Sequence, residues 1–294
     1  MKLLNFRAGR RESFGAIGTR GIVDLGARLR GGATDLTAFL RADLMERARA
    51  IADKEECDCA LEDVELMIPA GRCTRFFCIG VNYPERYEEY RDGAERAKYP
   101  SVFMRSHASF VAHGKPVLRP RESEQLDYEG EIAMVIGRGG RRIAQENAME
   151  HVCGYTCANE GTVRDWLRHS KFNVTPGKNF DRSGALGPWV VTVDEVGPGP
   201  LRVTTHVNGE RRQDDTSERM LFQMPYLISY LSTFCALEPG DVILSGTPAG
   251  AGARFDPPRY LRPGDHVEVE VSRVGILRNT VVDDADAVEE SRPA

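Results

Sequence analysis

Residues 127–136 read DYEGEIAMVI, so that a cluster of acidic residues runs without interruption into the apolar stretch Ile132–Ile136. Such a stretch is typical of a buried strand, on which residues two apart project to the same face. Glu129 and Glu131 are therefore expected to point the same way, and Asp127 can join them. Carboxylates held side by side disfavour each other's ionisation, and a hard divalent cation such as Mg²⁺, Mn²⁺ or Ca²⁺ relieves that cost. Spacing alone leaves two interpretations open, a metal site or an exposed acidic strand edge.

A second acidic cluster follows the next predicted strand, Gly154–Cys157. This strand delivers Asn159 and Glu160 to a loop before a short predicted helix, 162–168. A carboxylate in that loop suits a third metal ligand, and Arg164 in the helix would be free to bind an anionic substrate. Taken alone, these residues are better explained by helix capping beside a surface arginine. The two acidic clusters together favour the metal site.

The remaining pattern predicts a β-rich α+β protein and not a doubly wound parallel sheet. From Arg75 onward, short apolar β-runs are split by Gly and Pro, and they do not alternate regularly with helices. Asn208-Gly209 is a strong signal for a hairpin turn. The expected strands are 76–81, 132–136, 189–193, 201–207, 242–244 and 267–274, and the expected helices are 84–97, 144–149, 162–168 and 224–234.

The first 68 residues differ in character from the rest. We interpret them as a small N-terminal region, 1–68, joined to a main domain, 69–294. Phe14–Leu25 is typical of a short hairpin, because a Gly-containing turn lies between apolar residues. Asp35–Ala52 is expected to form one helix with Thr34 or Asp35 as its N-cap.

Composition argues against several classes of protein. The net charge of -5 and the pI near 5.8 give no electrostatic reason to expect nucleic acid as a partner. No stretch of about 18 uncharged apolar residues is present, so no membrane span is expected. The chain shows no signal peptide, and its seven cysteines are scattered. We therefore expect a soluble, cytoplasmic protein with reduced thiols and an acidic, frayed tail after Val282.

Many separate motifs between residues 72 and 282 occur in the order of one known family. They are Cys78–Tyr83, Asp127–Glu131, Gly154–Thr156, Asn159-Glu160, Arg164-Asp165, Gly177-Lys178, Gly187–Trp189, Val207–Glu210, Leu237–Asp241 and Gly246–Gly250. In these motifs the sequence resembles the fumarylacetoacetate hydrolase superfamily, and within it the fumarylpyruvate and acylpyruvate hydrolases.

The resemblance implies a mixed β-sandwich roll, a homodimer, and one Mg²⁺ or Mn²⁺ per active site. It implies that Glu129 and Glu131 are metal ligands, and that Glu160 is the third, at a position where the family most often has Asp. Lys178 matches the lysine that contacts the substrate and polarises the site. Further residues at positions expected to bind or orient the substrate are Arg164, Thr247 and Arg105.

One departure from the family bears on the reaction. In hydrolytic members a His-Glu pair after Asn-Tyr activates the attacking water; here Arg86 stands at the His position, while Glu89 remains in step. An arginine stays protonated and cannot act as a general base. Either Glu85 or Glu89 activates water directly, or the reaction needs no water. The segment 83–99 is expected to form a lid that sets specificity, with Tyr83 and Arg86 as substrate-binding candidates.

The leading hypothesis is a metal-dependent hydrolase that cleaves a C–C bond in a 1,3-dioxo-acid, of the acylpyruvate or fumarylpyruvate type, in aromatic catabolism. The alternative is a metal-dependent isomerase or decarboxylase of a related 2-oxo-acid. A catalytically idle scaffold is a third hypothesis, and the intact acidic cluster argues against it. A dehydrogenase is disfavoured because no Gly-x-Gly-x-x-Gly motif follows a strand. The catalytic candidates are Lys178, Glu89 and Glu85.

Overall fold

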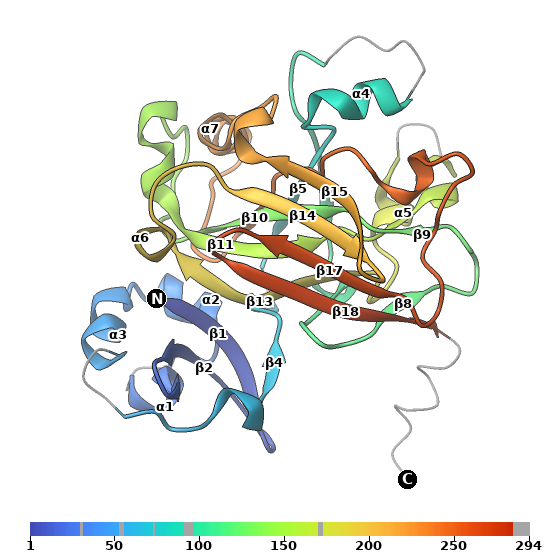
Figure 1. Cartoon of the computed structure of the whole chain (residues 1–294). Helices are drawn as coiled ribbons and strands as arrows, with labels where there is room; N and C mark the ends of the chain where they lie inside the picture. Colours follow the sequence, from blue (N-terminus) through green and yellow to red (C-terminus); the bar gives the residue numbers. More distant parts are fainter. Residues whose placement is uncertain (30–31, 53–55, 73, 91–96, 170–172, 285–294) are drawn as a thin grey trace.

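Two packed β-sheets dominate the computed structural model, which describes residues 1–29, 32–52, 56–72, 74–90, 97–169 and 173–284 (Figure 1). Eleven of the described strands form the larger, mixed sheet. Its strands are, in spatial order, β3 (Gly21–Val23), β2 (Arg11–Gly18), β1 (Lys2–Ala8), β13 (Gly184–Thr192), β11 (Val152–Asn159), β10 (Gly130–Ile136), β16 (Val242–Leu244), β5 (Phe76–Gly80) and β6 (Ser101–Arg105), with β4 (Glu65–Met67) beside β1 and β7 (Phe110–Val111) beside β13.

Five described strands form the second sheet, which packs across β10, β11 and β13 of the first. In spatial order they are β15 (Glu210–Thr216), β14 (Arg202–Val207), β17 (His266–Val271), β18 (Gly275–Asp283) and β8 (Val117–Arg119). The turn between β14 and β15 confirms the predicted hairpin, because Asn208 and Gly209 have positive φ values of 53° and 78°. Separately, β9 (Leu126–Asp127) pairs with β12 (Thr162–Val163).

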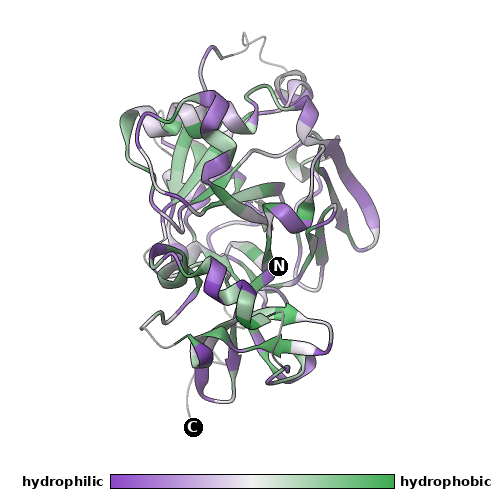
Figure 2. Ribbon diagram, turned by 90° about the vertical axis from the view of Figure 1, so that its left-hand side faces the viewer, coloured by the Kyte–Doolittle hydropathy of each residue, from purple (hydrophilic) through white to green (hydrophobic). Residues whose placement is uncertain are grey.

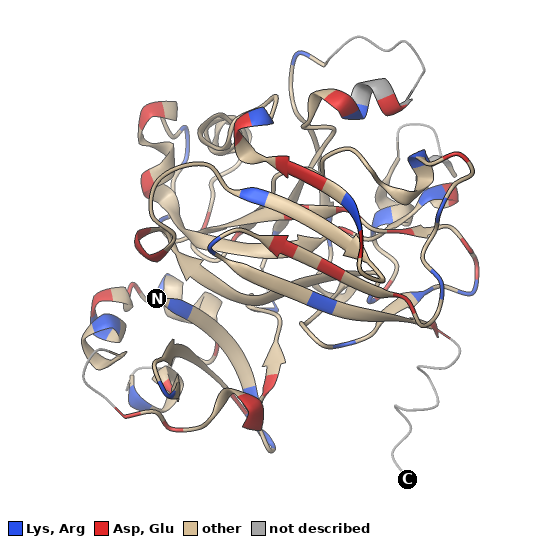
Figure 3. Cartoon of the chain, in the orientation of Figure 1, with Lys and Arg blue, Asp and Glu red and all other residues tan. Residues whose placement is uncertain are grey.

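Alternating side chains on β10 divide the hydrophobic core. Ile132 and Met134 pack into the cluster shared with the second sheet, whereas Ala133 and Val135 pack into the cluster shared with the N-terminal elements. Burial on both faces explains the continuous apolar run in the sequence. Figure 2 shows green, hydrophobic residues on strands in the interior of the molecule and purple, hydrophilic residues on an outlying hairpin. Figure 3 shows acidic and basic residues interspersed on the strands of the second sheet.

The predicted helix 35–52 is two helices. Asp35 caps α2 (Leu36–Arg41) as expected, since its side chain accepts a hydrogen bond from Ala38 N at 2.8 Å. The chain then leaves the helical conformation, with Asp43 at a positive φ of 51°, before α3 (Met45–Ala52) begins. The prediction of one continuous helix is wrong at this break.

The predicted helix 162–168 is also wrong in part. Thr162 and Val163 pair with β9, and a short 3-10 helix, Arg164–Arg168, follows. The prediction 224–234 is confirmed as α7 (Met224–Phe234), and 144–149 corresponds to a 3-10 helix at Gln145–His151. The prediction 84–97 corresponds to α4 (Pro84–Tyr90), while 91–96 lie outside the described residues, as does the tail 285–294. The other helices are α1 (Leu25–Arg28), α5 (Thr175–Lys178) and α6 (Val193–Val196).

The N-terminal strands belong to the same sheet as the main domain. The predicted hairpin is confirmed as β2 and β3, and β1 pairs with β13 through Lys2 opposite Val191 and Leu3 opposite Val190. The boundary near residue 69 stays a prediction. No helix in the described part of the chain is long and apolar enough to cross a membrane.

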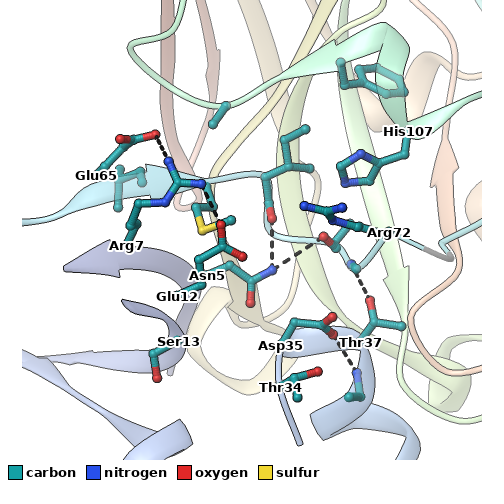
Figure 4. Close-up of a pocket in the computed structure, with 18 of the residues that line it drawn as sticks. Asn5, Arg7, Glu12, Ser13, Thr34, Asp35, Thr37, Glu65, Arg72 and His107 are labelled. Carbon is teal, nitrogen blue, oxygen red and sulfur yellow. Dashed lines mark hydrogen bonds and ion pairs between the residues drawn. The ribbon is translucent and has the colours of Figure 1, made fainter. Parts of the chain in front are cut away.

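A cavity of about 1020 Å³ lies between the N-terminal elements and the main domain (Figure 4). Much of its polar lining is paired internally: Arg7 bonds Glu12 and Glu65, and Asn5 donates to the carbonyls of Ile68 and Ala70. The acidic cluster predicted from the sequence is not part of the described lining. The cavity and the candidate metal centre are therefore separate places in the fold.

Candidate metal centre

The structure brings Glu129, Glu131 and Glu160 together. One carboxylate oxygen of each lies within 4.8 Å of the others, and the three residues are only 4%, 1% and 1% exposed. Antiparallel pairing places the start of β10 beside the end of β11, with Gly130 opposite Asn159. Glu160 N then donates to Glu129 O at 2.7 Å, which fixes the third glutamate beside the first two.

Glu129 lies at the centre of a cluster of cations. Its Oε2 accepts from Lys178 Nζ at 2.6 Å, and its Oε1 accepts from Arg164 Nη2 at 2.7 Å and from Arg86 Nη2 at 3.3 Å. Burial alone would raise the pKa of Glu129, but Arg164, Lys178 and Arg86 together hold that pKa well below its usual range. Glu129 is therefore an anion in the metal-free protein.

The other two glutamates carry the oxygens that suit a metal. Among the described residues, Glu131 Oε1 and Glu160 Oε1 are buried and have no hydrogen-bond partner. A buried polar atom without a partner is costly and calls for an explanation. Carboxylate oxygens are the ligands that Mg²⁺ and Mn²⁺ prefer. The donor set fits a hard divalent cation, which would supply the missing partner to both oxygens.

Without such a cation, Glu131 is in an unfavourable environment. Burial raises the pKa of Glu131 well above its ordinary value, and the neighbouring Glu160 and Glu129 raise it further. Lys178 responds in the opposite sense: burial lowers its pKa, but the carboxylates of Glu129 and Glu160 outweigh burial and leave the pKa raised. Lys178 is therefore a buried ammonium, 2.6 Å from Glu129 and 3.2 Å from Glu160.

Acidic side chains around the centre outnumber the cationic ones by one. Five carboxylates face four cationic side chains, so that the cluster carries one net negative formal charge. A bound divalent cation would add two positive charges to a site shielded from water, where uncompensated charge is costly. The acidic members are Glu89, Asp127, Glu129, Glu131 and Glu160, and the basic members are Arg86, Arg105, Arg164 and Lys178.

Two predicted site residues, Arg86 and Glu89, lie on α4 and contact the centre. Arg86 is 2% exposed and bonds Glu89 at 2.6 Å in addition to Glu129. Glu89 Oε1 accepts from Gly250 N at 2.7 Å, so both of its carboxylate oxygens are engaged. Glu85 instead pairs with Arg219, outside the centre. Tyr83 is fully buried, and burial raises its pKa.

The remaining candidates have structural partners. Arg105 is buried and donates to Gly161 O at 2.9 Å and to Ser183 Oγ at 3.0 Å, so it braces the loop beside Glu160. Arg164 was expected to be free for an anion; that expectation is wrong, because the guanidinium also bonds Asp127 at 2.8 Å. Its position beside Asp127 follows from the pairing of β12 with β9.

Asp127 does not join the glutamates, although alternation allowed it. Its carboxylate accepts from Gly252 N at 2.8 Å and from Ala253 N at 2.9 Å as well as from Arg164. Gln213 on β15 is a further polar residue at the centre that the sequence pattern did not indicate; its side chain is 1% exposed, and its Oε1 accepts from Gly130 N at 2.9 Å. Gln213 lies in the polar run 210–216, so its residue type does not distinguish it from its neighbours. The hairpin turn at Asn208-Gly209 is the feature that could have indicated it, because the turn fixes which residues of β15 face inward.

Comparison with known proteins agrees with this geometry. Residues 75–282 match the family described as fumarylacetoacetate (FAA) hydrolase, C-terminal. The chain belongs to the fumarylacetoacetate hydrolase family. A similar sequence is oxaloacetate tautomerase YisK of Bacillus subtilis (strain 168), which is 40% identical over 226 residues, or 76% of this chain and 74% of that protein.

Two solved structures are similar to this one over almost the whole chain. A fumarylacetoacetate hydrolase from Exiguobacterium antarcticum is 32% identical, with a TM-score of 0.80, and covers 96% of this chain and 99% of its own. A probable 2-hydroxyhepta-2,4-diene-1,7-dioate isomerase from Mycobacterium abscessus is 31% identical, with a TM-score of 0.79, over 97% and 99% of the two chains. The fumarylacetoacetate hydrolase family thus includes proteins named as hydrolases, isomerases and tautomerases, and the β-rich α+β fold predicted from the sequence is confirmed.

Proposed function

We propose that the chain is a divalent-metal-dependent tautomerase that interconverts the keto and enol forms of a 2-oxo-dicarboxylate such as oxaloacetate. The observation that carries the proposal is the buried guanidinium of Arg86, which bonds both Glu89 and Glu129. It occupies the position where a hydrolytic relative needs a neutral base to activate water. The names of the similar tautomerases and isomerases support the same conclusion.

The charge of the site supports an anionic substrate. Five carboxylates face four cationic side chains, so a bound Mg²⁺ or Mn²⁺ leaves an excess of positive charge. A carboxylate of the substrate would compensate that excess among buried side chains, where water screens charge poorly.

When bound, Mg²⁺ or Mn²⁺ would act as a Lewis acid that stabilises negative charge on the oxo oxygen of the substrate. Glu129, Glu131 and Glu160 would hold it. Lys178, a buried ammonium beside Glu129 and Glu160, would donate a hydrogen bond to the oxygen on which charge develops and so stabilise the enolate selectively.

The test is the decay of enol-oxaloacetate absorbance with protein loaded with Mg²⁺ or Mn²⁺, compared with buffer containing the same metal. Malate dehydrogenase and NADH, which consume the keto form, give an independent measure of the product. Acceleration that disappears with EDTA supports the proposal. A rate equal to the metal-only background in both assays refutes it.

Hydrolysis of an acylpyruvate-type acid is the second candidate. Glu89 is the observation that favours it, because this carboxylate stays in step with the water-activating pair of hydrolytic relatives and lies against the site through Arg86. Product analysis separates the reactions: hydrolysis yields two acids, decarboxylation yields CO₂, and tautomerisation leaves the mass unchanged. The homodimer implied by the family resemblance is also a proposal, and sedimentation velocity tests it.

A further inference from the structure

The backbone of Gly130, between the candidate ligands Glu129 and Glu131, is bonded on both sides by side chains. Gly130 N donates to Gln213 Oε1 at 2.9 Å, and Gly130 O accepts from Thr247 Oγ1 at 2.9 Å. Gln213 Nε2 in turn donates to Thr247 Oγ1 at 2.8 Å. These bonds close a ring, here called the Gly130 clamp, formed by Gly130, Gln213 and Thr247.

The clamp joins the two sheets, because Gln213 lies on β15 and Gly130 lies on β10. Thr205 on β14 lies directly opposite Gln213 on β15, and a shift in register follows immediately after Thr205. A Cβ added to Gly130 would meet Thr205 Oγ1 at 2.0 Å, so only glycine lets the second sheet come this near. The packing of the second sheet therefore holds Gln213 against the backbone of Gly130, which lies between the two candidate ligands.

The chemistry of the clamp calls for an amide at position 213. Gln213 Nε2 donates both of its hydrogens, one to Thr247 and one to Pro248 O at 2.8 Å, while Oε1 accepts from Gly130. A glutamate carboxylate has no hydrogen to donate to either partner. The residue is 1% exposed, so lost bonds would not be replaced by water.

The loop that carries Thr247 also bonds a candidate ligand directly. Gly246 N donates to Glu131 Oε2 at 2.7 Å. One short segment thus fixes the Glu131 carboxylate and, through Thr247, the peptide that precedes Glu131 in the chain. Rotation of that peptide would change the direction in which Glu129 and Glu131 leave the strand.

We propose that Gln213 is a positioning residue that acts through Gly130 to set the separation of Glu129 and Glu131 for a divalent cation. The inference rests on the metal site of the proposed function, but not on the reaction. Outer partners of metal ligands typically change metal affinity about 10- to 100-fold when removed. Removal of the Gln213 amide is expected to weaken the binding of a divalent cation by the same factor.

The experiment measures Mn²⁺ binding by calorimetry and the Mn²⁺ EPR spectrum for native protein, Gln213→Met and Gln213→Glu. Both variants should bind Mn²⁺ about 10- to 100-fold more weakly and give a broadened spectrum. Asn279→Leu is the matched control, because Asn279 is a 5% exposed amide that donates to Ala112 O at 2.9 Å and Lys115 O at 2.7 Å. It should lower thermal stability and leave Mn²⁺ binding and the spectrum unchanged.

Thr247 supplies a second test if the Gln213 variants do not fold. Thr247→Ser keeps the hydroxyl and should bind Mn²⁺ like the native protein, whereas Thr247→Val should bind it more weakly. Native affinity and spectrum in folded Gln213→Met, or in Thr247→Val, would overturn the inference. Native protein that binds Mn²⁺ but does not accelerate enol conversion would refute the tautomerase alone. Failure of the native protein to bind Mn²⁺ would overturn both.

Discussion

Glu129→Gln and Glu131→Gln remove the same charge from the same centre, yet the surroundings of the two carboxylates predict opposite effects on the metal-free protein. Glu129 neutralises three buried cations, Lys178, Arg164 and Arg86. Glu131 faces other carboxylates, and its pKa is raised by burial and by Glu160 and Glu129. The first exchange leaves cations without an anion, while the second removes a group that is costly to ionise.

The magnitudes follow from these contacts. Removing one partner of a buried ion pair costs about 3–5 kcal/mol, so Glu129→Gln should lower the free energy of unfolding by about that amount. At roughly 2–4 °C per kcal/mol for a domain of this size class, the Tm of the metal-free protein should fall by about 6 °C or more. Glu131→Gln should leave the Tm within about 2 °C of the native value or raise it.

Thermal unfolding of EDTA-treated protein, with and without Mn²⁺, measures both effects. Mn²⁺ at a hundred times its Kd should stabilise native protein by about 2.7 kcal/mol, and both variants should lose most of this gain. Glu238→Gln is the control, because Glu238 is 54% exposed and pairs with Arg41 at the surface; a change of less than about 1 kcal/mol is expected. If metal-free Glu131→Gln is destabilised as much as Glu129→Gln, the assignment of charges in the centre is wrong.

Three further predictions concern Arg86 on α4, the core thiols and the contact between the sheets. Arg86→His should give hydrolysis of an acylpyruvate, measured as pyruvate by chromatography; equal hydrolysis by native protein would contradict the role given to Arg86. Burial raises the pKa of the Cys153 and Cys157 thiols to about 12, so alkylation at pH 8 should modify them only after unfolding, as peptide mass spectrometry would show. Gly130→Ala should destabilise the protein by about 1–3 kcal/mol, because its Cβ meets Thr205, and Thr205→Ala should recover part of the loss in denaturant unfolding; no recovery would exclude this clash as the cause.

The sequence predicted elements well where burial leaves a simple pattern. β10 is buried on both faces, and α7 has an apolar face and no charged residue, so their positions could be inferred directly. The prediction failed at 162–168 because the pairing of β12 with β9 is a contact between distant residues, which local propensity does not contain. The same applies to the break at Asp43 within the predicted helix 35–52.

The candidate site was likewise predictable only in part. Alternation along β10 was enough to predict that Glu129 and Glu131 point together, and the family resemblance added Glu160 and Lys178. The partners of Arg164 were not predictable, because Asp127 reaches it only through the pairing of two short strands. Gln213 lies in a run of polar residues, and only the packing of the second sheet against Gly130 distinguishes it from its neighbours.

The pairing of β1 with β13 has a consequence for any shortened form of the chain. β13 lies between β11 and β1 in the larger sheet, and its residues Val190 and Val191 are fully buried. A chain that starts at residue 69 would lose β1 and leave the backbone donors and acceptors on that side of β13 open, next to apolar side chains. An open apolar edge is a template for another strand. Such a chain should self-associate through β13, even with every residue of the candidate metal centre retained.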